Sequence, residues 1–118
     1  MPGPMERLHD AVLKARIDDP ASSRTARLLR SGRSKMVKKL VEEATEVAID
    51  ALADDRFAVI RESADLFYNL SVLWVEMGVE PGEVWAEMER REQLYGIAEK
   101  LHKGPVALGD DKSLIKRR

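Results

Sequence analysis

Residues 38–47 read KKLVEEATEV, and this stretch places three glutamates, Glu42, Glu43 and Glu46, within five consecutive positions. Apolar residues recur around the glutamates at helical spacing over residues 37–51. A repeat of three or four residues between apolar positions is typical of an amphipathic helix and not of a strand. The stretch therefore predicts an acidic helix near the middle of the chain.

The sequence on either side continues the helical pattern. Residues 5–17 alternate charged and aliphatic side chains at helical spacing, and residues 56–77 contain the run LFYNLSVLWV, which is apolar nearly all round. Only a short break around Asp54 and Asp55 separates the two central helices, so we expect them to pack antiparallel. Pro81 fits the first turn of a further helix. The predicted fold class is all-α, centred on an antiparallel helical hairpin.

Length and composition set broad limits on the chain. Its 118 residues suit one domain, which we place at residues 1–103, followed by a loosely ordered C-terminal tail at residues 104–118. The formal net charge of -1 gives no general attraction to nucleic acid or to an anionic membrane. The run LFYNLSVLWV is too short to span a bilayer, and the N-terminus lacks the apolar core of a secretory signal. We expect a cytoplasmic protein that binds neither nucleic acid nor membrane.

Five carboxylates gather on the two central helices. An α-helix turns by about 100° per residue, so Glu42, Glu43 and Glu46 share an arc of roughly 100°. The motif ESAD adds Glu62 and Asp65, which lie about 60° apart on the next helix. Each helix therefore carries a compact acidic patch.

A solvated acidic face is the simpler interpretation of these patches. The core side of the first helix is taken as its apolar stripe, Val37, Leu40, Ala44, Ala48 and Ala51. Glu42 and Glu46 then project almost opposite to the stripe, and Glu43 lies at its edge. Like charges one turn apart cost roughly 0.2–0.5 kcal/mol, which a surface helix tolerates.

Three features favour a metal site instead. No lysine or arginine lies between Lys39 and Arg56 to relieve the glutamates, and Thr45 and Ile49 share the acidic side of the helix. The partner helix is also apolar on more than one face, so the acidic patches could face each other across a partly buried cleft. Carboxylates in such a cleft are costly without a cation. Oxygen ligands with no cysteine or histidine nearby suit Mg²⁺, with Mn²⁺ as the alternative ion.

A basic segment comes directly before the acidic one. Residues 24–39 contain seven cationic side chains and no acid: Arg24, Arg27, Arg30, Arg33, Lys35, Lys38 and Lys39. A divalent cation can bridge phosphate oxygens and activate a water, which leaves phosphate charge to be neutralised. We predict that Arg27, Lys35, Lys38 and Lys39 bind the phosphates of a nucleotide substrate. A solvated basic segment is the alternative.

The chain resembles the phosphoribosyl-ATP pyrophosphohydrolases of histidine biosynthesis, within the all-α, MazG-like NTP pyrophosphatases. The superfamily pattern EExxE followed by ExxD appears as EEATE at residues 42–46 and ESAD at residues 62–65. The narrower family pattern S-Y-T-A-R-L-L appears as SRTARLL, and ADLLYHLLVLL appears as ADLFYNLSVLW. The resemblance extends to the MERRE segment and covers roughly residues 6–100.

The resemblance implies a function as well as a fold. It implies Mg²⁺-dependent hydrolysis of phosphoribosyl-ATP to phosphoribosyl-AMP and pyrophosphate by a homodimer, or a larger assembly, in which helical hairpins form a four-helix-bundle-type core. The implied metal ligands are Glu43, Glu46, Glu62 and Asp65. One carboxylate, Glu42 or Glu43, would orient or deprotonate the attacking water, and the basic segment would face the phosphates.

Three positions depart from the family pattern. Arg24 replaces a tyrosine, Val41 replaces a glycine, and Asn69 replaces a histidine. These departures keep open a second hypothesis, a house-cleaning pyrophosphatase that acts on another (d)NTP or nucleotide. The strongly apolar helix around residues 66–75 motivates a third, a non-catalytic helical dimer.

Overall fold

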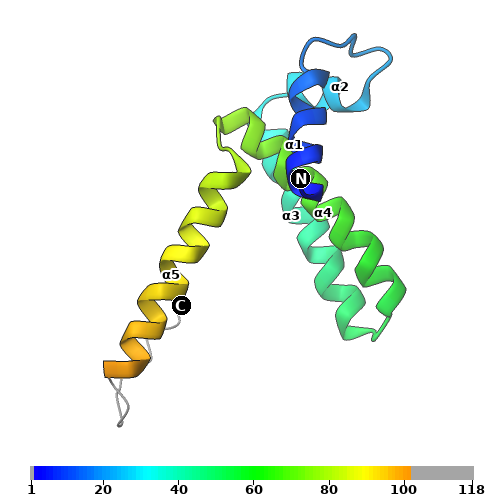
Figure 1. Cartoon of the computed structure of the whole chain (residues 1–118). Helices are drawn as coiled ribbons and strands as arrows, with labels where there is room; N and C mark the ends of the chain where they lie inside the picture. Colours follow the sequence, from blue (N-terminus) through cyan, green and yellow to red (C-terminus); the bar gives the residue numbers. More distant parts are fainter. Residues whose placement is uncertain (1, 102–118) are drawn as a thin grey trace. The chain divides into compact units, whose positions relative to one another are not determined.

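A computed structural model describes residues 2–101, and its regular secondary structure within that range is helical throughout (Figure 1). The helices are α1 (Pro4–Ala15), α2 (Arg24–Arg30), α3 (Arg33–Leu52), α4 (Arg56–Met77) and α5 (Pro81–Leu101). The predicted all-α fold is confirmed. The chain divides into two compact units, and the first, which ends at Pro81, contains α1–α4. The tail predicted at residues 104–118 lies outside the described residues.

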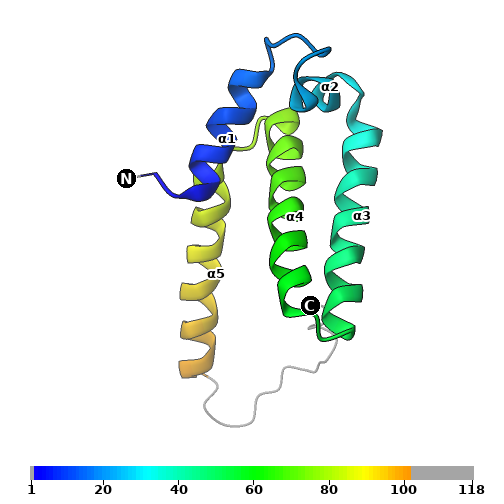
Figure 2. The same cartoon turned by 90° about the vertical axis from the view of Figure 1, so that its right-hand side faces the viewer.

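Helices α3 and α4 form the predicted antiparallel hairpin and run side by side (Figures 1 and 2). The turn between them uses Asp54 in the left-handed region, at φ 57°, which aspartate tolerates better than most residues. Asp55 then caps α4, because its carboxylate accepts a hydrogen bond from the backbone N–H of Ala58 at 3.1 Å. Gly78, at φ 72°, ends the helix. Local chemistry thus sets both ends of α4.

The segment before α3 forms a short helix of its own. Ser23 caps α2 by accepting a hydrogen bond from the N–H of Ala26 at 3.0 Å. Gly32, at φ 99°, then redirects the chain into α3, in a backbone conformation that side chains with a Cβ rarely adopt. The basic segment of the sequence therefore lies on α2 and on the first turns of α3.

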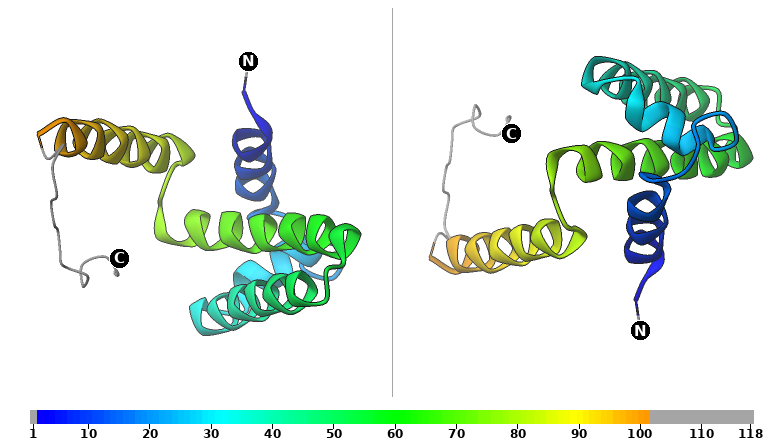
Figure 3. Two further views of the ribbon diagram at one scale, coloured as in Figure 1. Left: turned by 90° about the horizontal axis from the view of Figure 1, so that it is seen from below. Right: turned by 90° about the horizontal axis from the view of Figure 1, so that it is seen from above.

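Helix α4 lies between α1 and α3 within the first unit (Figure 3). The buried core cluster draws one or more side chains from each of these helices: Val12, Met36, Val72 and Val75. His9 on α1 is also buried, and its Nε2 donates a hydrogen bond to the carbonyl of Val79 at 3.0 Å. Helices α1 and α2 thus close the core at one end of the hairpin.

The two halves of the hairpin differ in how completely they are covered. We define the capped half as residues 33–43 and 65–77, and the turn half as residues 44–64. The buried side chains of the capped half are Met36, Asn69, Ser71, Val72 and Val75. In the turn half only Ala58 is buried, and Leu52 and Phe57 are 90% and 72% exposed. The turn half therefore carries an apolar surface that the other helices of the first unit leave uncovered.

The predicted core side of α3 is largely wrong. Four of its five positions, Val37, Ala44, Ala48 and Ala51, are exposed within the first unit. Met36, which is 1% exposed, sets the rotation of the helix because a large side chain gains more from burial than an alanine does. This rotation places Leu40, Glu43 and Val47 toward α4, where all three are half-buried.

Within residues 2–101, no helix combines the length and the apolar character needed to cross a membrane.

Candidate functional site

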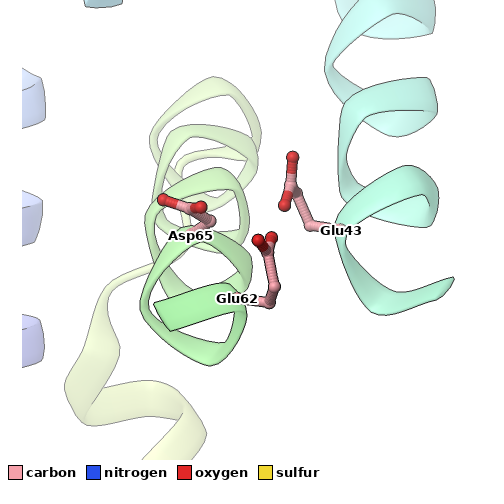
Figure 4. A group of neighbouring side chains, drawn as sticks. All are labelled: Glu43, Glu62 and Asp65. Carbon is pink, nitrogen blue, oxygen red and sulfur yellow. The ribbon is translucent and has the colours of Figure 1, made fainter. Parts of the chain in front are cut away.

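Three carboxylates meet between α3 and α4 near the boundary of the two halves. Figure 4 shows Glu43 extending from α3 toward α4, with Glu62 and Asp65 on α4 beside it. One oxygen from each residue lies within 4.8 Å of the others. Positions three apart share a face of a helix, which explains why Glu62 and Asp65 act together. The antiparallel pairing of the hairpin then supplies Glu43.

The electrostatics of this acidic cluster are unfavourable without a cation. Oε1 of Glu43 is buried and accepts no hydrogen bond. A protonated Glu62 shares a hydrogen bond with the Glu43 carboxylate, and this interaction, followed by desolvation, raises the pKa of Glu62. Glu62 in turn raises the pKa of Glu46 by the same kind of carboxyl–carboxylate hydrogen bond and by charge repulsion. Raised carboxyl pKa values mean that the site favours added positive charge.

The donor set fits a hard divalent cation. The three carboxylates offer oxygen ligands only, which suits Mg²⁺ or Mn²⁺ better than a metal that prefers sulfur or imidazole. Among the predicted ligands, the structure brings together Glu43, Glu62 and Asp65. Glu46 is exposed but lies against Glu62. Glu42 is exposed and does not belong to the cluster.

A basic hollow of about 360 Å³ opens beside α2. Its lining residues are Arg24, Arg27, Leu28, Ser31, Lys35, Lys39, Tyr68 and Asn69. Three predicted phosphate ligands, Arg27, Lys35 and Lys39, are therefore brought together, while Lys38 is exposed and does not line the hollow. The Nη1 of Arg27 donates a hydrogen bond to the carbonyl of Pro20 at 2.8 Å, which restrains this guanidinium. The surplus of cations suits an anionic ligand.

A second hollow of about 410 Å³, the acidic hollow, lies next to the first. Its lining residues are Arg24, Thr25, Glu43, Asp65, Tyr68 and Asn69. Arg24, Tyr68 and Asn69 line both hollows and so form a shared wall. An elongated anion could therefore contact the cations of one hollow and a carboxylate-bound metal of the other at the same time.

Sequence reasoning did not assign a role to two residues of this arrangement. Tyr68 lies in the apolar run LFYNLSVLWV and Thr25 in the segment SRTARLL, so neither stands out as a polar site residue. A usable signal for Tyr68 is its position three residues after Asp65, which puts both on one helix face. Thr25 has no comparable signal, because it lies on another helix and reaches α4 only through the tertiary fold.

Comparison with known proteins places the chain among close relatives. The sequence model described as phosphoribosyl-ATP pyrophosphohydrolase matches residues 5–92. A Rhodopseudomonas palustris protein named phosphoribosyl-ATP pyrophosphatase 2 is 64% identical over 86% of this chain and 78% of its own length. A Bradyrhizobium diazoefficiens protein of the same name is 62% identical over 88% and 78%. A Granulibacter bethesdensis protein named phosphoribosyl-ATP pyrophosphatase is 48% identical over 86% and 64%.

Proposed function

The chain belongs to the phosphoribosyl-ATP pyrophosphohydrolase family, and from this premise we propose how its two hollows divide the reaction. The enzyme hydrolyses phosphoribosyl-ATP to phosphoribosyl-AMP and pyrophosphate, a step of histidine biosynthesis. One observation carries the proposed division of roles: the basic hollow and the acidic hollow adjoin along the wall of Arg24, Tyr68 and Asn69.

The basic hollow holds the phosphates that do not react. Arg27, Lys35 and Lys39 line it together, and their charges offset part of the negative charge of a polyphosphate. Arginine adds bidentate geometry, which orients a phosphate as well as attracting it. Lys38 is exposed one position away from Lys39, and we assign it a contribution to the field that attracts the substrate.

The acidic hollow holds the metal and the attacking water. Glu43, Glu62 and Asp65 are the proposed ligands of a Mg²⁺ ion, and Glu46 supports them through Glu62. When bound, the ion polarises phosphate oxygens and makes a water more acidic. Mn²⁺ has the same preference for oxygen ligands and is the alternative ion.

Glu43 is the proposed base that orients the water. Its Oε1 is buried without a hydrogen-bond donor, so this oxygen is ready to accept one from water. The proton lost by the water passes toward this oxygen as the anhydride is cleaved. Glu42 is exposed on α3, and within one chain we assign it no contact with the substrate.

A homodimer is the proposed assembly. The turn half exposes large apolar side chains that a small domain gains by covering: Ile49, Leu52, Phe57 and Ile60. A second hairpin laid against this surface would complete a four-helix bundle. We also propose a cytoplasmic location, because a phosphorylated nucleotide carries several charges and does not cross a bilayer unaided.

The test is pyrophosphate release from phosphoribosyl-ATP, beside a panel of NTPs, by the purified protein with Mg²⁺. We expect release from phosphoribosyl-ATP, and we expect Glu43→Gln to lower kcat about 10²- to 10⁴-fold, the range of a general base. Glu89→Gln, on the exposed part of α5, is the matched control and should leave kcat unchanged. Release from a different NTP only would move the substrate assignment, and full activity of Glu43→Gln would remove Glu43 from the mechanism.

A further inference from the structure

The shared wall of the two hollows contains three polar side chains with different capacities. Arg24 is exposed, Tyr68 is half-buried, and Asn69 is 5% exposed. A phosphate chain that extends from the basic hollow to the acidic hollow must pass all three. The question is which of them can hold it in place.

Asn69 is a poor donor to that chain, because one of its two Nδ2 hydrogens is already used and the side chain is buried. Its Nδ2 donates a hydrogen bond to the backbone carbonyl of Asp65 at 2.9 Å, and a carbonyl can only accept, so this contact fixes the orientation of the amide. The remaining oxygen, Oδ1, is buried and has no partner. Since phosphate oxygens are acceptors, Asn69 Oδ1 would repel them. Since Asn69 is only 5% exposed, the accessible donors of the wall are Arg24 and Tyr68.

Tyr68 is the better restrained of these two donors. Its hydroxyl lies 2.7 Å from Oγ1 of Thr25, a contact that joins α4 to α2. Its ring also packs against the buried core cluster of Val12, Met36, Val72 and Val75. Arg24 has a long side chain, is exposed, and forms no ion pair with a described residue.

The hydroxyl pair can be oriented in two ways, because either oxygen can donate to the other. If Thr25 donates to Tyr68, the phenolic proton is left to point into the acidic hollow, which both residues line. A phosphate oxygen carries no proton, so its arrival selects this arrangement. The resulting bond is a charge-assisted hydrogen bond, which is stronger than one between neutral groups.

We infer that the Tyr68 hydroxyl, oriented by Thr25, donates a hydrogen bond to the phosphate chain of the substrate where it crosses from the basic hollow to the acidic hollow. Thr25 is then a positioning residue that acts through Tyr68. The inference rests on the proposed function, because it needs a polyphosphate that spans both hollows. It adds the Tyr68 hydroxyl, a group of the shared wall, to the carboxylates and cations that take part in the reaction.

A double-mutant cycle tests the inference with kcat and KM measured separately for pyrophosphate release from phosphoribosyl-ATP. A hydrogen bond to a charged group corresponds to a loss of roughly 10- to 150-fold in kcat/KM for Tyr68→Phe. Thr25→Val should lose less, because the phenolic proton remains. The double variant should match Tyr68→Phe, since Thr25 has nothing left to orient. Tyr95→Phe, the exposed tyrosine of α5, is the control and should keep full activity.

A purely structural role predicts a different pattern. If the Thr25–Tyr68 bond only fastens α2 to α4, the three variants lose stability equally and lose activity in proportion. That result, or full activity of Tyr68→Phe, overturns the inference and leaves the proposed function intact. If Tyr68→Phe does not fold, Thr25→Val decides, and its full activity overturns the inference. No pyrophosphate release by the unsubstituted protein overturns the proposed function and the inference together.

Discussion

The capped half and the turn half of the α3–α4 hairpin belong to the same pair of helices, yet they are stabilised differently. The capped half completes its core within the chain, because α1 and α2 cover Met36 and Val72, which are 1% and 0% exposed. The turn half leaves Leu52 and Phe57 largely exposed. The acidic cluster lies at the boundary between the halves. Within the first unit, internally packed support is thus present on one side of the site only.

This difference explains how the site can be partly formed in a single chain. Glu43, Asp65 and Tyr68 belong to the capped half, where packing against α1 and α2 fixes the helix rotation. Glu62 belongs to the turn half, where the other helices of the first unit offer little support. Catalytic side chains need supporting contacts that fix their geometry. Covering the turn half would extend such support to the rest of the acidic cluster.

The largest expected effect removes the support of the capped half. Met36→Ala should lower the free energy of unfolding by about 2–5 kcal/mol, because it removes a buried side chain and leaves a cavity. Met77→Ala, at a position 52% exposed near the end of α4, is the matched control and should cost much less. Urea unfolding followed by circular dichroism measures both. Equal losses would show that the burial of Met36 contributes nothing special to the stability of the capped half.

The second effect is expected on assembly and concerns the turn half. Phe57→Glu should weaken the proposed homodimer by about 2 kcal/mol or more, roughly a 30-fold rise in the dissociation constant, because aromatic side chains commonly dominate interfaces. Ile17→Glu is the control, since Ile17 is 89% exposed but lies between α1 and α2. Sedimentation over a concentration series measures the dissociation constant. A monomeric unsubstituted protein, or equal effects of both substitutions, would contradict a dimer through the turn half.

The helices could be predicted from the sequence because their signals are local. The bounds of α4 follow from Asp55 and Gly78, a cap and a left-handed residue that need no tertiary information. The core face of α3 could not be predicted in the same way. Its apolar stripe is wide and rich in alanine, so the rotation depends on where the large side chain of Met36 finds its cavity.

The candidate site, too, could be predicted where its signals are local and could not be predicted where they depend on tertiary contacts. Helical spacing and charge indicated the acidic patches, including the pairing of Glu62 with Asp65, and the basic segment; the resemblance to a known family indicated their roles. The shared wall could not be predicted, because Thr25 and Tyr68 are far apart in sequence and meet only when α2 packs on α4. That Glu43 joins the acidic cluster while Glu42 stays exposed likewise depends on the rotation of α3 and could not be predicted.

The smallest expected effect comes from titration of the acidic cluster at the boundary of the halves. Neighbouring carboxylates raise the pKa of Glu62 and Glu46 above the ordinary value of 4.5, so the folded protein binds these protons more tightly than the unfolded chain. Stability therefore falls as pH rises through the folded pKa values, and it is regained as pH decreases toward 4.5. Glu87 acts in the opposite sense, because Arg90 and Arg91 lower its pKa to about 2, but its contribution is constant above pH 4.5.

Without metal, the protein should thus unfold at a slightly higher temperature at pH about 5 than at neutral pH, since both groups reach solvent and the repulsion is partly screened. Glu62→Gln should raise the melting temperature at neutral pH and reduce the difference between the two pH values. Saturating Mg²⁺ should also reduce the difference in melting temperature between the two pH values, because a bound cation offsets the repulsion between the carboxylates. Differential scanning fluorimetry with and without Mg²⁺ measures these shifts, with Glu89→Gln as the control. A melting temperature that rises steadily from pH about 5 to neutral pH in the metal-free protein would contradict this prediction. It would mean that repulsion between the carboxylates of the cluster does not lower the stability of the protein.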